Sequence, residues 1–318
     1  MNHEQADSEL QRVAGGHIPG APGIPAFHLH APEPSPVPVL IAVPHAGRAY
    51  PRALLAEMRH AESAALRLED RYVDLLGKAV ARATGASLLV AEAPRAMIDL
   101  NRAPDDVDWD MFARSTRPDS VGHLLPSRRA RSGLGLIPRR LPGMGEIWRR
   151  RHEEADLSAR IAGIHTPYHE ALSGRLGTLR ERWGAALLLD LHSMPPLSPR
   201  LGQAPVEFVI GDRFGVSCHG SVIAAAFAQL SELRREAAHN RPYAGGYVLE
   251  RHAQPRAGIH AIQLEMDRSC YLDSRLAEPG AGMEAMVEDL VALVRKLASI
   301  VAEIGQDGTG RNWPMAAE

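Results

Sequence analysis

Residues 187–196 read Leu-Leu-Leu-Asp-Leu-His-Ser-Met-Pro-Pro, an apolar run that stops at polar residues and then meets two prolines. Such a run is typical of a buried parallel strand that ends abruptly in a loop. His192 would then lie at the carboxyl end of a sheet, where the loops of open α/β folds converge on a ligand crevice. The alternative interpretation is a core histidine that donates to a backbone carbonyl.

Residues 37–43 repeat this pattern, because their apolar, β-branched run is stopped by Pro44 and followed at once by His45. Two histidines at strand ends are harder to explain as core residues than one. The apolar patterns predict strands at residues 86–91, 206–210 and 261–264, and helices over residues 66–83, 146–164, 166–182 and 284–304. We therefore expect an α/β fold with a mixed, mostly parallel sheet flanked by helices.

Proline and glycine divide the chain into regions. Residues 1–36 carry them at a density that prevents helix and offers little core, so we expect an extended or partly disordered lead-in. Residues 37–305 are expected to form a single α/β domain, followed by a polar, frayed tail over residues 306–318. Within the domain, residues 105–145 predict a long loop, and loops of this length often act as lids or binding loops.

The composition, 45% hydrophobic and 23% charged, indicates a soluble protein with a small-molecule partner. A formal net charge of −2, from 36 basic and 38 acidic residues, argues against binding to nucleic acid or to an anionic membrane. Because the two cysteines lack metal-binding spacing and no apolar leader or long apolar run occurs, we expect a cytoplasmic protein. No glycine-rich nucleotide motif is present, and a homo-oligomer is compatible with these features.

The predicted strands end in residues suited to metal and acid–base chemistry, namely His45, Arg95, His192 and Glu265. Two imidazoles and one carboxylate form the ligand set of a catalytic zinc site, which keeps a fourth position open for water. Zinc lowers the pKa of that water to about 7, and a glutamate that does not bind the metal could take up its proton. Arginine and asparagine side chains could hold a carboxylate and polarise the attacked carbonyl.

Six short segments, in order along the chain, resemble the N-formylglutamate amidohydrolase family: residues 44–47, 70–74, 95–102, 133–137, 190–193 and 263–265. The resemblance runs from about residue 37 to 270, and the ordered set is more specific than any one segment. This family consists of metal-dependent deformylases of histidine breakdown, related to zinc carboxypeptidases, aspartoacylases and succinylglutamate desuccinylases. The resemblance implies a zinc carboxypeptidase-like fold and one divalent metal ion, which we expect to be zinc.

The resemblance also implies roles for single residues. It makes His45 and His192 metal ligands, Glu265 the general base, Arg95 the group that polarises the carbonyl, and Asn101 and Arg102 the binders of the substrate α-carboxylate. The activity that these roles imply is cleavage of N-formyl-L-glutamate to formate and L-glutamate.

One position departs from the wider superfamily, whose first two ligands come from a His-x-x-Glu motif. Here the residue three positions after His45 is Arg48, which cannot bind a cation, so the carboxylate ligand must come from elsewhere. Asp70 is our choice, because it lies in the matching segment and would share a helix face with Asp74. The remaining candidates are Glu69, Asp74 and Glu92.

The expected substrate is a small dicarboxylic N-acyl amino acid, since arginines are concentrated near the predicted metal site. Its side-chain carboxylate needs a cation of its own, for which Arg114 and Arg139 in the long loop are candidates. Two other functions stay open: a related hydrolase acting on larger acyl groups of other N-acyl amino acids, and a metal- or carboxylate-binding module without turnover. Glu265 beside the histidine pair argues against the second, because a binding module needs no general base.

Overall fold

The computed structural model describes residues 11–113, 128–199 and 204–308. Its centre is an eight-stranded sheet with the strand order β1-β2-β4-β3-β7-β10-β8-β9. The strands are β1 (Gln11–Gly15), β2 (Phe27–Ala31), β3 (Val39–Val43), β4 (Ser87–Ala91), β7 (Ala186–Met194), β8 (Phe208–Gly211), β9 (Ala237–His239) and β10 (Ile259–Asp267). The central strands β4, β3, β7 and β10 are parallel, whereas β2 and β8 pair antiparallel with them on either side. The prediction of a mixed, mostly parallel sheet is confirmed.

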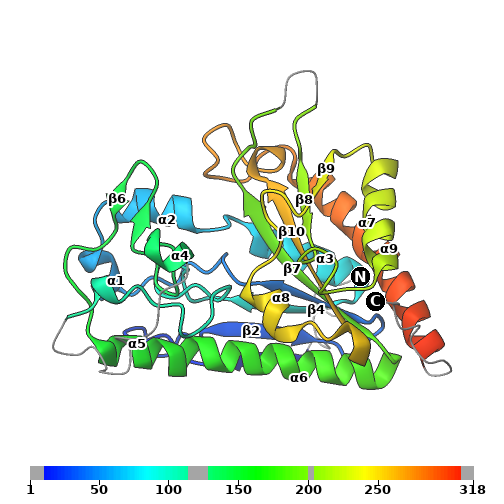
Figure 1. Ribbon diagram of the computed structural model, residues 1–318, viewed down its shortest axis with the longest axis horizontal. Helices are drawn as coiled ribbons and strands as arrows, with labels where there is room; N and C mark the ends of the chain where they lie inside the picture. The colour runs from blue at the N-terminus through cyan, green and yellow to red at the C-terminus, as the bar shows by residue number, and fades with distance from the viewer. Residues whose placement is uncertain (1–10, 114–127, 200–203, 309–318) are drawn as a thin grey trace, which may run out of the picture.

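Helices cover both faces of this sheet (Figure 1). They are α3 (Val73–Thr84), α7 (Gly220–Glu232) and α9 (Met283–Gly308) on one face, and α6 (Thr166–Trp183) on the other. Leu188 packs in the core under α6, while Leu187 and Leu189 pack in the core under α3, α7 and α9. Because both faces are buried, the central strands read as unbroken apolar runs.

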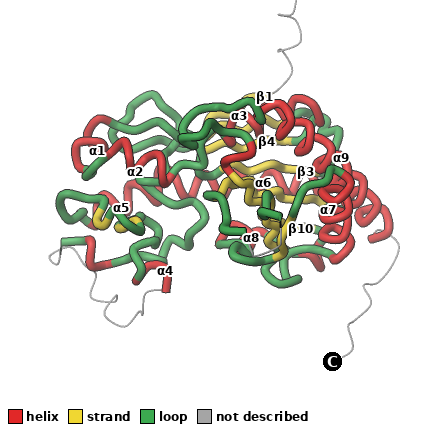
Figure 2. The backbone as a smooth tube through the Cα atoms, turned by 90° about the horizontal axis from the view of Figure 1, so that it is seen from above, coloured by secondary structure: helices red, strands yellow, loops and turns green. Residues whose placement is uncertain are grey.

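A group of shorter elements lies to one side of the sheet, and we call it the side lobe (Figures 1 and 2). It comprises α1 (Arg52–Glu57), α2 (Ala61–Leu68), α4 (Arg128–Arg131), α5 (Glu154–Arg160) and the hairpin of β5 (Arg140–Leu141) and β6 (Gly145–Glu146). α5 continues through a π-helical turn (Ile161–His165) into α6, so one helix runs beneath both the side lobe and the sheet. The short helix α8 (Tyr247–His252) contacts β10. Within the described ranges, no helix combines the length and the apolar character that crossing a membrane requires.

The predicted lead-in is largely ordered, which corrects our expectation for residues 1–36. β1 and β2 form one edge of the sheet, and Ala26 and Phe27 are almost fully buried. The glycines and prolines occupy the turns around these strands and do not prevent them, as Gly16 shows with a φ of +63° directly after β1. Residues 1–10 lie outside the described residues.

The described parts of residues 105–145 also correct a prediction, because this segment is not one long loop. It contains a 3₁₀ turn (Trp109–Met111), α4 and β5. The side chains of Leu136 and Ile137 are buried in the main core, so this part of the segment is packed. Single apolar residues among prolines and glycines gave no periodic signal, which is why the sequence concealed these elements.

Three predicted helix boundaries are wrong. The helix expected over residues 66–83 is split between Leu68 and Val73, where Tyr72 adopts a positive φ of 58°. The helix expected from residue 146 begins only at Glu154, because the preceding residues belong to the β5–β6 hairpin and to the segment after it. α9 continues to Gly308 and so takes in the start of the predicted tail, whose remaining residues lie outside the described ranges.

Candidate metal and substrate site

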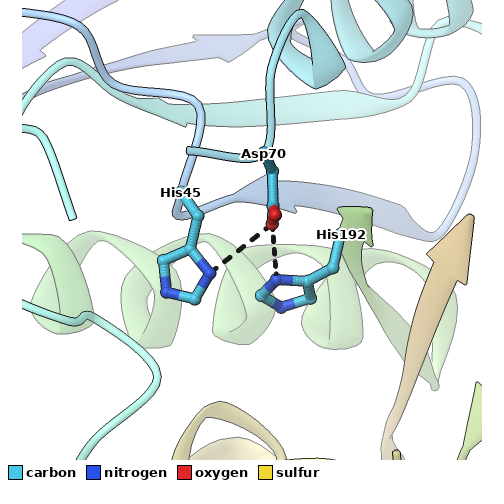
Figure 3. Close-up of side chains that lie close together, drawn as sticks. All are labelled: His45, Asp70 and His192. Carbon is cyan, nitrogen blue, oxygen red and sulfur yellow. Dashed lines mark hydrogen bonds and ion pairs between the residues drawn. The ribbon is translucent and has the colours of Figure 1, made fainter. Parts of the chain in front are cut away.

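Three strand ends and one helix break bring the site together. His45 follows β3 through Pro44, His192 lies near the end of β7, and Glu265 on β10 pairs in register with His192. Asp70 lies in the break between α2 and α3, and its backbone N–H donates to the carbonyl of His45 at 2.9 Å. This bond places the carboxylate over the strand ends. Figure 3 shows the side chains of His45, Asp70 and His192 pointing toward one another.

These three side chains form a buried group that could hold a metal ion. Asp70 Oδ2 lies 3.0 Å from His192 Nδ1 and 3.5 Å from His45 Nδ1, and the three ligand atoms lie within 4.8 Å of one another. His45 Nδ1 is buried and has no hydrogen-bond partner among the described residues. An unpaired ring nitrogen in the interior costs free energy unless something coordinates it. Two imidazoles, one carboxylate and this open nitrogen fit a divalent cation such as zinc.

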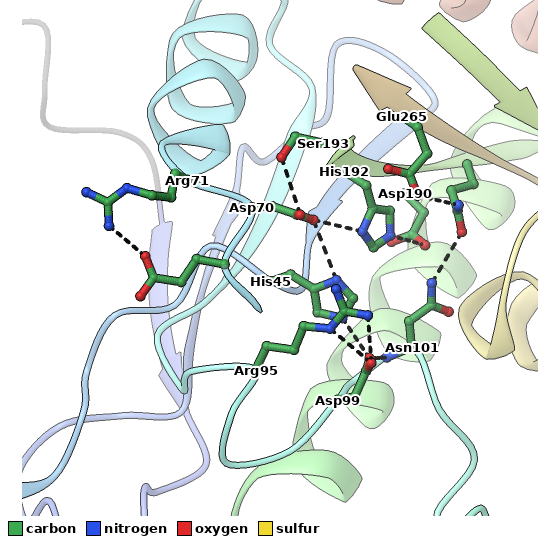
Figure 4. A network of polar contacts seen from close by, with 12 residues as sticks. His45, Asp70, Arg71, Arg95, Asp99, Asn101, Asp190, His192, Ser193 and Glu265 are labelled. Atoms are coloured by element: carbon green, nitrogen blue, oxygen red, sulfur yellow. Dashed lines mark hydrogen bonds and ion pairs between the residues drawn. The ribbon is translucent and has the colours of Figure 1, made fainter. Parts of the chain in front are cut away.

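Each histidine is held from behind by a second carboxylate (Figure 4). Asp99 Oδ1 accepts from His45 Nε2 at 2.7 Å, and Asp190 Oδ2 accepts from His192 Nε2 at 2.8 Å. Because these bonds hold each ring through Nε2, Nδ1 is the ring nitrogen that faces the shared space. The sequence analysis did not assign this role to Asp99 or Asp190. One signal was available, since Asp190 lies two residues before His192 and therefore on the same face of the strand.

The charges around Asp70 fix which of its oxygens faces the histidines. Burial alone would raise the pKa of the Asp70 carboxyl, but the two neighbouring histidines hold it well below its usual range. Burial would likewise lower the pKa of His192, but Asp190 raises it well above its usual value. Asp70 Oδ1 accepts from Arg268 Nη2 at 3.1 Å and from Ser193 Oγ at 3.3 Å. Asp70 therefore presents Oδ2 to the space between the two rings.

The other carboxylates that we considered as ligands are bound elsewhere. Their partners are Arg48 at 2.9 Å and Lys78 at 3.1 Å for Asp74, Arg71 at 2.9 Å for Glu69, and His28 at 3.0 Å for Glu92. The expectation that Asp70 shares a helix face with Asp74 is wrong, because Asp70 lies in the break before α3 begins. Position in the break, and not helical spacing, is what directs Asp70 toward the histidines.

Glu265 lies beside this group and is held by a chain of amides. Gln263 Nε2 donates to Glu265 Oε1 at 2.9 Å, and Asn101 Nδ2 donates to Gln263 Oε1 at 3.2 Å. The backbone N–H of Val248 in α8 donates in turn to Asn101 Oδ1 at 2.9 Å. Burial raises the pKa of Glu265 to about 7. A carboxyl group with this pKa can accept and release a proton near neutral pH.

A cavity of about 200 Å³ opens in front of these side chains. Seven residues from the sequence analysis line it: His45, Asp70, Arg95, Asn101, Arg102, His192 and Glu265. Arg95 donates through Nε and Nη2 to Asp99 Oδ2 at 3.0 and 2.9 Å, and Arg102 Nε lies 3.9 Å from the same oxygen. The lining also includes four residues that the sequence analysis did not single out, namely Arg67, Arg129, Tyr243 and Arg268.

One of the two arginines predicted to bind a second substrate carboxylate, Arg139, is not found in this lining. Arg139 pairs with Asp108 at 2.7 Å and with Glu146 at 3.5 Å, so its charge is neutralised outside the cavity. Its position does not fit the predicted role. Arg114 lies outside the described residues. The predicted loop does contribute one cation to the cavity, because Arg129 belongs to the segment 105–145.

Behind the segment 99–102 lies a chain of buried histidines, which we call the histidine chain and which consists of His165, His169 and His252. His169 Nε2 donates to the carbonyl of Leu100 at 3.1 Å, and His165 Nε2 donates to the carbonyl of Arg102 at 2.9 Å. His252 Nε2 lies 2.9 Å from His169 Nδ1. These bonds fix the backbone on both sides of Asn101, whose side chain lines the cavity.

A family profile and two relatives of known name point to the same family. The N-formylglutamate amidohydrolase family profile matches residues 37–272 of this chain. A relative from Pseudomonas aeruginosa named N-formylglutamate deformylase is 29% identical over 279 residues, covering 85% of this chain and 95% of the relative. A second protein of that name, from Pseudomonas putida, is 31% identical over 275 residues and covers 85% of this chain and 94% of the relative.

Solved structures agree with the sequence comparison. The crystal structure of N-formylglutamate amidohydrolase from Ralstonia eutropha JMP134 matches with a TM-score of 0.78 and 31% identity, covering 87% of this chain and 99% of that one. The gene product Atu2144 from Agrobacterium tumefaciens matches with a TM-score of 0.61 and 18% identity, covering 87% and 96% of the two chains. At that identity, the second likeness shows a shared fold and nothing more.

Proposed function

This chain belongs to the N-formylglutamate amidohydrolase family, and from that premise we propose that it hydrolyses N-formyl-L-glutamate to formate and L-glutamate. The observation that carries the proposal is the buried group of His45, Asp70 and His192 in one cavity with Glu265 and cationic side chains. Two imidazole rings and one carboxylate suit a hydrolytic metal, and the arginines suit an anionic substrate. A binding module would need no buried carboxyl group with a pKa near neutrality beside the metal ligands.

His45, His192 and Asp70 would hold the metal ion, which we propose to be zinc. Zinc in such a site supplies Lewis acidity and an activated water molecule. The protein's own contribution is to orient the ligands: Asp99 and Asp190 hold the two rings, and Arg268 holds the second oxygen of Asp70. This support keeps the ligand atoms in place before a cation arrives.

Glu265 acts as the base that takes a proton from the attacking water and passes it to the nitrogen of the leaving amino acid. Gln263 donates to Oε1, so Oε2 is the oxygen that remains for this proton. The pKa of about 7 that burial gives the group suits both halves of the transfer, because such a group accepts and releases a proton at similar cost.

Arg95, Asn101 and Arg102 bind and polarise the substrate. Asp99 fixes the guanidinium of Arg95 through two of its nitrogens, and the side chain lines the cavity, where it can stabilise negative charge on the attacked carbonyl oxygen. Arg102 and the remaining N–H of the Asn101 amide hold the α-carboxylate. The histidine chain fixes the backbone that carries Asn101 and Arg102, because it bonds the carbonyls of Leu100 and Arg102.

The test is formate release, or release of the corresponding acid, from N-formyl-, N-acetyl- and N-succinyl-L-glutamate by the purified, zinc-loaded protein. The cavity of about 200 Å³ is small for a ligand site, so kcat/KM should fall from formyl to acetyl to succinyl. A preference for the succinyl compound would replace the proposal with a hydrolase of larger acyl groups. Binding of all three without turnover would leave a binding module.

A further inference from the structure

The arginines that line the cavity fall into two classes. Arg95 is bound to Asp99 and Arg268 to Asp70, and Arg102 Nε lies 3.9 Å from Asp99 Oδ2, so these three guanidinium groups lie beside protein carboxylates. Arg67 and Arg129 also line the cavity, and neither has a hydrogen bond or ion pair from its side chain to any residue that the structure describes. Both side chains are exposed. Two cations in the lining are therefore open to a ligand.

The free arginines come from the side lobe, whereas two of the three proposed metal ligands come from the sheet. Arg67 lies near the end of α2 and Arg129 lies in α4, and both views of the backbone place these helices beside the sheet and apart from it (Figures 1 and 2). His45 and His192, by contrast, belong to the strand ends. A substrate that extends from the metal-binding side chains toward the side lobe would thus reach the two free arginines.

Of the two free arginines, Arg129 lies within electrostatic reach of the groups that would hold the substrate. Burial lowers the pKa of Arg102, and the positive charge of Arg129 lowers it further. The same charge acts on Tyr243, which also lines the cavity. Arg129 and Arg102 therefore face a common space, where two like charges repel each other unless an anion lies between them.

The cavity as a whole carries an excess of positive charge. Among the residues that the structure describes, five arginines line it, whereas Asp70 and Glu265 are the carboxylates of that lining. A bound divalent metal would increase the excess. An anion with a single charge leaves one of the guanidinium groups without a partner, while a dicarboxylate can satisfy Arg102 and Arg129 together.

We propose that Arg129 binds the side-chain carboxylate of the substrate and makes the site selective for N-formyl derivatives of acidic amino acids. The proposal rests on the proposed function, because it takes the α-carboxylate to lie at Arg102. Only a short carbon chain separates the two carboxylates of glutamate, which matches two cations that face one space. The planar fork of the guanidinium group gives two parallel hydrogen bonds to a carboxylate and none of that geometry to an amide.

The experiment compares N-formyl-L-glutamate with N-formyl-L-glutamine, which has the same size but no charge on its side chain. In the zinc-loaded Arg129→Gln variant, kcat/KM for the glutamate compound should fall by about 10- to 100-fold, mainly through KM, as expected for losing a charged hydrogen bond. The value for the glutamine compound should change by less than about threefold. Zinc content, measured by elemental analysis, should equal that of the unchanged protein.

Arg131→Gln is the matched control, because Arg131 lies on the same short helix, is exposed and does not line the cavity. It removes the same charge and should leave both substrates unaffected. Arg67→Gln provides the comparison within the lining. If Arg67→Gln abolishes the preference for glutamate and Arg129→Gln keeps it, the proposal is overturned in favour of Arg67.

Failure of the proposed function can be told apart from failure of this inference. Should the unchanged protein cleave neither formyl compound, calorimetric binding of L-glutamate and L-glutamine to the zinc-loaded protein still tests the carboxylate site. A preference for glutamate that disappears in the Arg129→Gln variant supports the inference without any turnover. Equal affinities for the two amino acids, or a preference that survives in this variant, would contradict it.

Discussion

Two sets of buried histidines lie close to the cavity and have opposite chemistry. We call the candidate metal ligands His45, Asp70 and His192 the metal group. Its two rings, His45 and His192, each bond a carboxylate through Nε2 and leave Nδ1 facing a shared space. The rings of the histidine chain bond backbone carbonyls, a hydroxyl group and one another. Burial is similar in both sets. The partner, and not the degree of burial, decides whether a histidine can serve as a ligand.

Proton positions in the histidine chain follow from its partners. The carbonyl of Leu100 can only accept, so His169 carries its proton on Nε2 and accepts at Nδ1 from His252. His252 then accepts at Nδ1 from the hydroxyl group of Ser173, 3.2 Å away. Burial lowers the pKa of His169 to about 2 and that of His252 to about 4. In the metal group, Asp190 raises the pKa of His192. Burial therefore keeps His169 and His252 neutral, whereas carboxylates orient His45 and His192 toward the shared space.

The largest effect should come from removing a ligand of the metal group. In the His192→Ala protein, both zinc content and formate release should fall to background, because two ligands cannot hold the ion in place. The matched change in the histidine chain, His169→Ala, should keep its zinc. Elemental analysis of both variants makes the comparison, and full metal content in the His192→Ala protein would remove this residue from the ligand set.

The next largest effect is expected at Glu265. Glu265→Gln should retain zinc and substrate binding but lose about 10²- to 10⁴-fold in kcat, which is the usual contribution of a positioned acid or base. The carboxyl group must be ionised to accept a proton, so the activity of the unchanged protein should rise as the pH increases through about 7. This acid limb should be absent from the residual activity of the variant. Full activity in Glu265→Gln would mean that another residue is the base, with Asp190 as the next candidate.

A smaller effect is expected from the carboxylates behind the ligands. Asp190→Asn keeps the volume of the side chain but loses the charge that orients and polarises His192. Zinc affinity should fall by about 10- to 100-fold, as is usual when such an outer partner is removed. Competition with a chelator of known affinity measures this change. An unchanged affinity would mean that packing alone orients the ring.

The smallest effect concerns the dependence of stability on pH. A histidine in the unfolded chain has a pKa of about 6.5, above the folded values of His169 and His252, so only the unfolded state gains protons as the pH falls below 6.5. The stabilisation is complete above that pH and is lost as the pH decreases toward the folded pKa values. For each such histidine, the free energy of unfolding should fall by about 1.4 kcal/mol per pH unit.

Replacing His252 with glutamine isolates this contribution, because glutamine keeps a donor for His169 and does not titrate. Urea unfolding of the metal-free proteins between pH 6.5 and 4.5 should show a slope that is shallower by about 1.4 kcal/mol per pH unit in the His252→Gln variant. Equal slopes would mean that His252 is already protonated in the folded protein. The metal-free state keeps zinc release from contributing to the comparison.

The sequence was most informative where a strand is buried on both faces. β3, β7 and β10 give unbroken apolar runs, and His45, His192 and Glu265 follow from where those runs end. β1 and β2 were missed because glycines and prolines surround them and β2 is only partly buried. Glycine and proline are frequent both in turns that connect strands and in disordered segments, so their presence alone does not distinguish the two.

The rest of the site depends on contacts between distant segments. The position of Asp70 is set by a backbone bond to His45 and a positive φ at Tyr72, and neither leaves a periodic signal in the sequence. Arg139 looked available because Asp108, its partner, lies far from it in the sequence. The arginines near the predicted metal site indicated that cations bind the substrate carboxylates. Only the fold distinguishes an arginine that is paired with a protein carboxylate from one that is free to bind substrate.

The helix that runs through α5, the π-helical turn and α6 also constrains how the protein could measure its substrate. Arg129 belongs to the side lobe and His192 to the sheet, and this helix passes beneath both (Figure 1). Any change in the gap between the two would have to bend a continuous helix or disrupt its π-helical turn, where His165 is bonded to Arg102. With the metal and Arg129 placed as proposed, this continuous helix would fix the distance between the metal and the second carboxylate. An amino acid of another length would then be rejected without any closing motion.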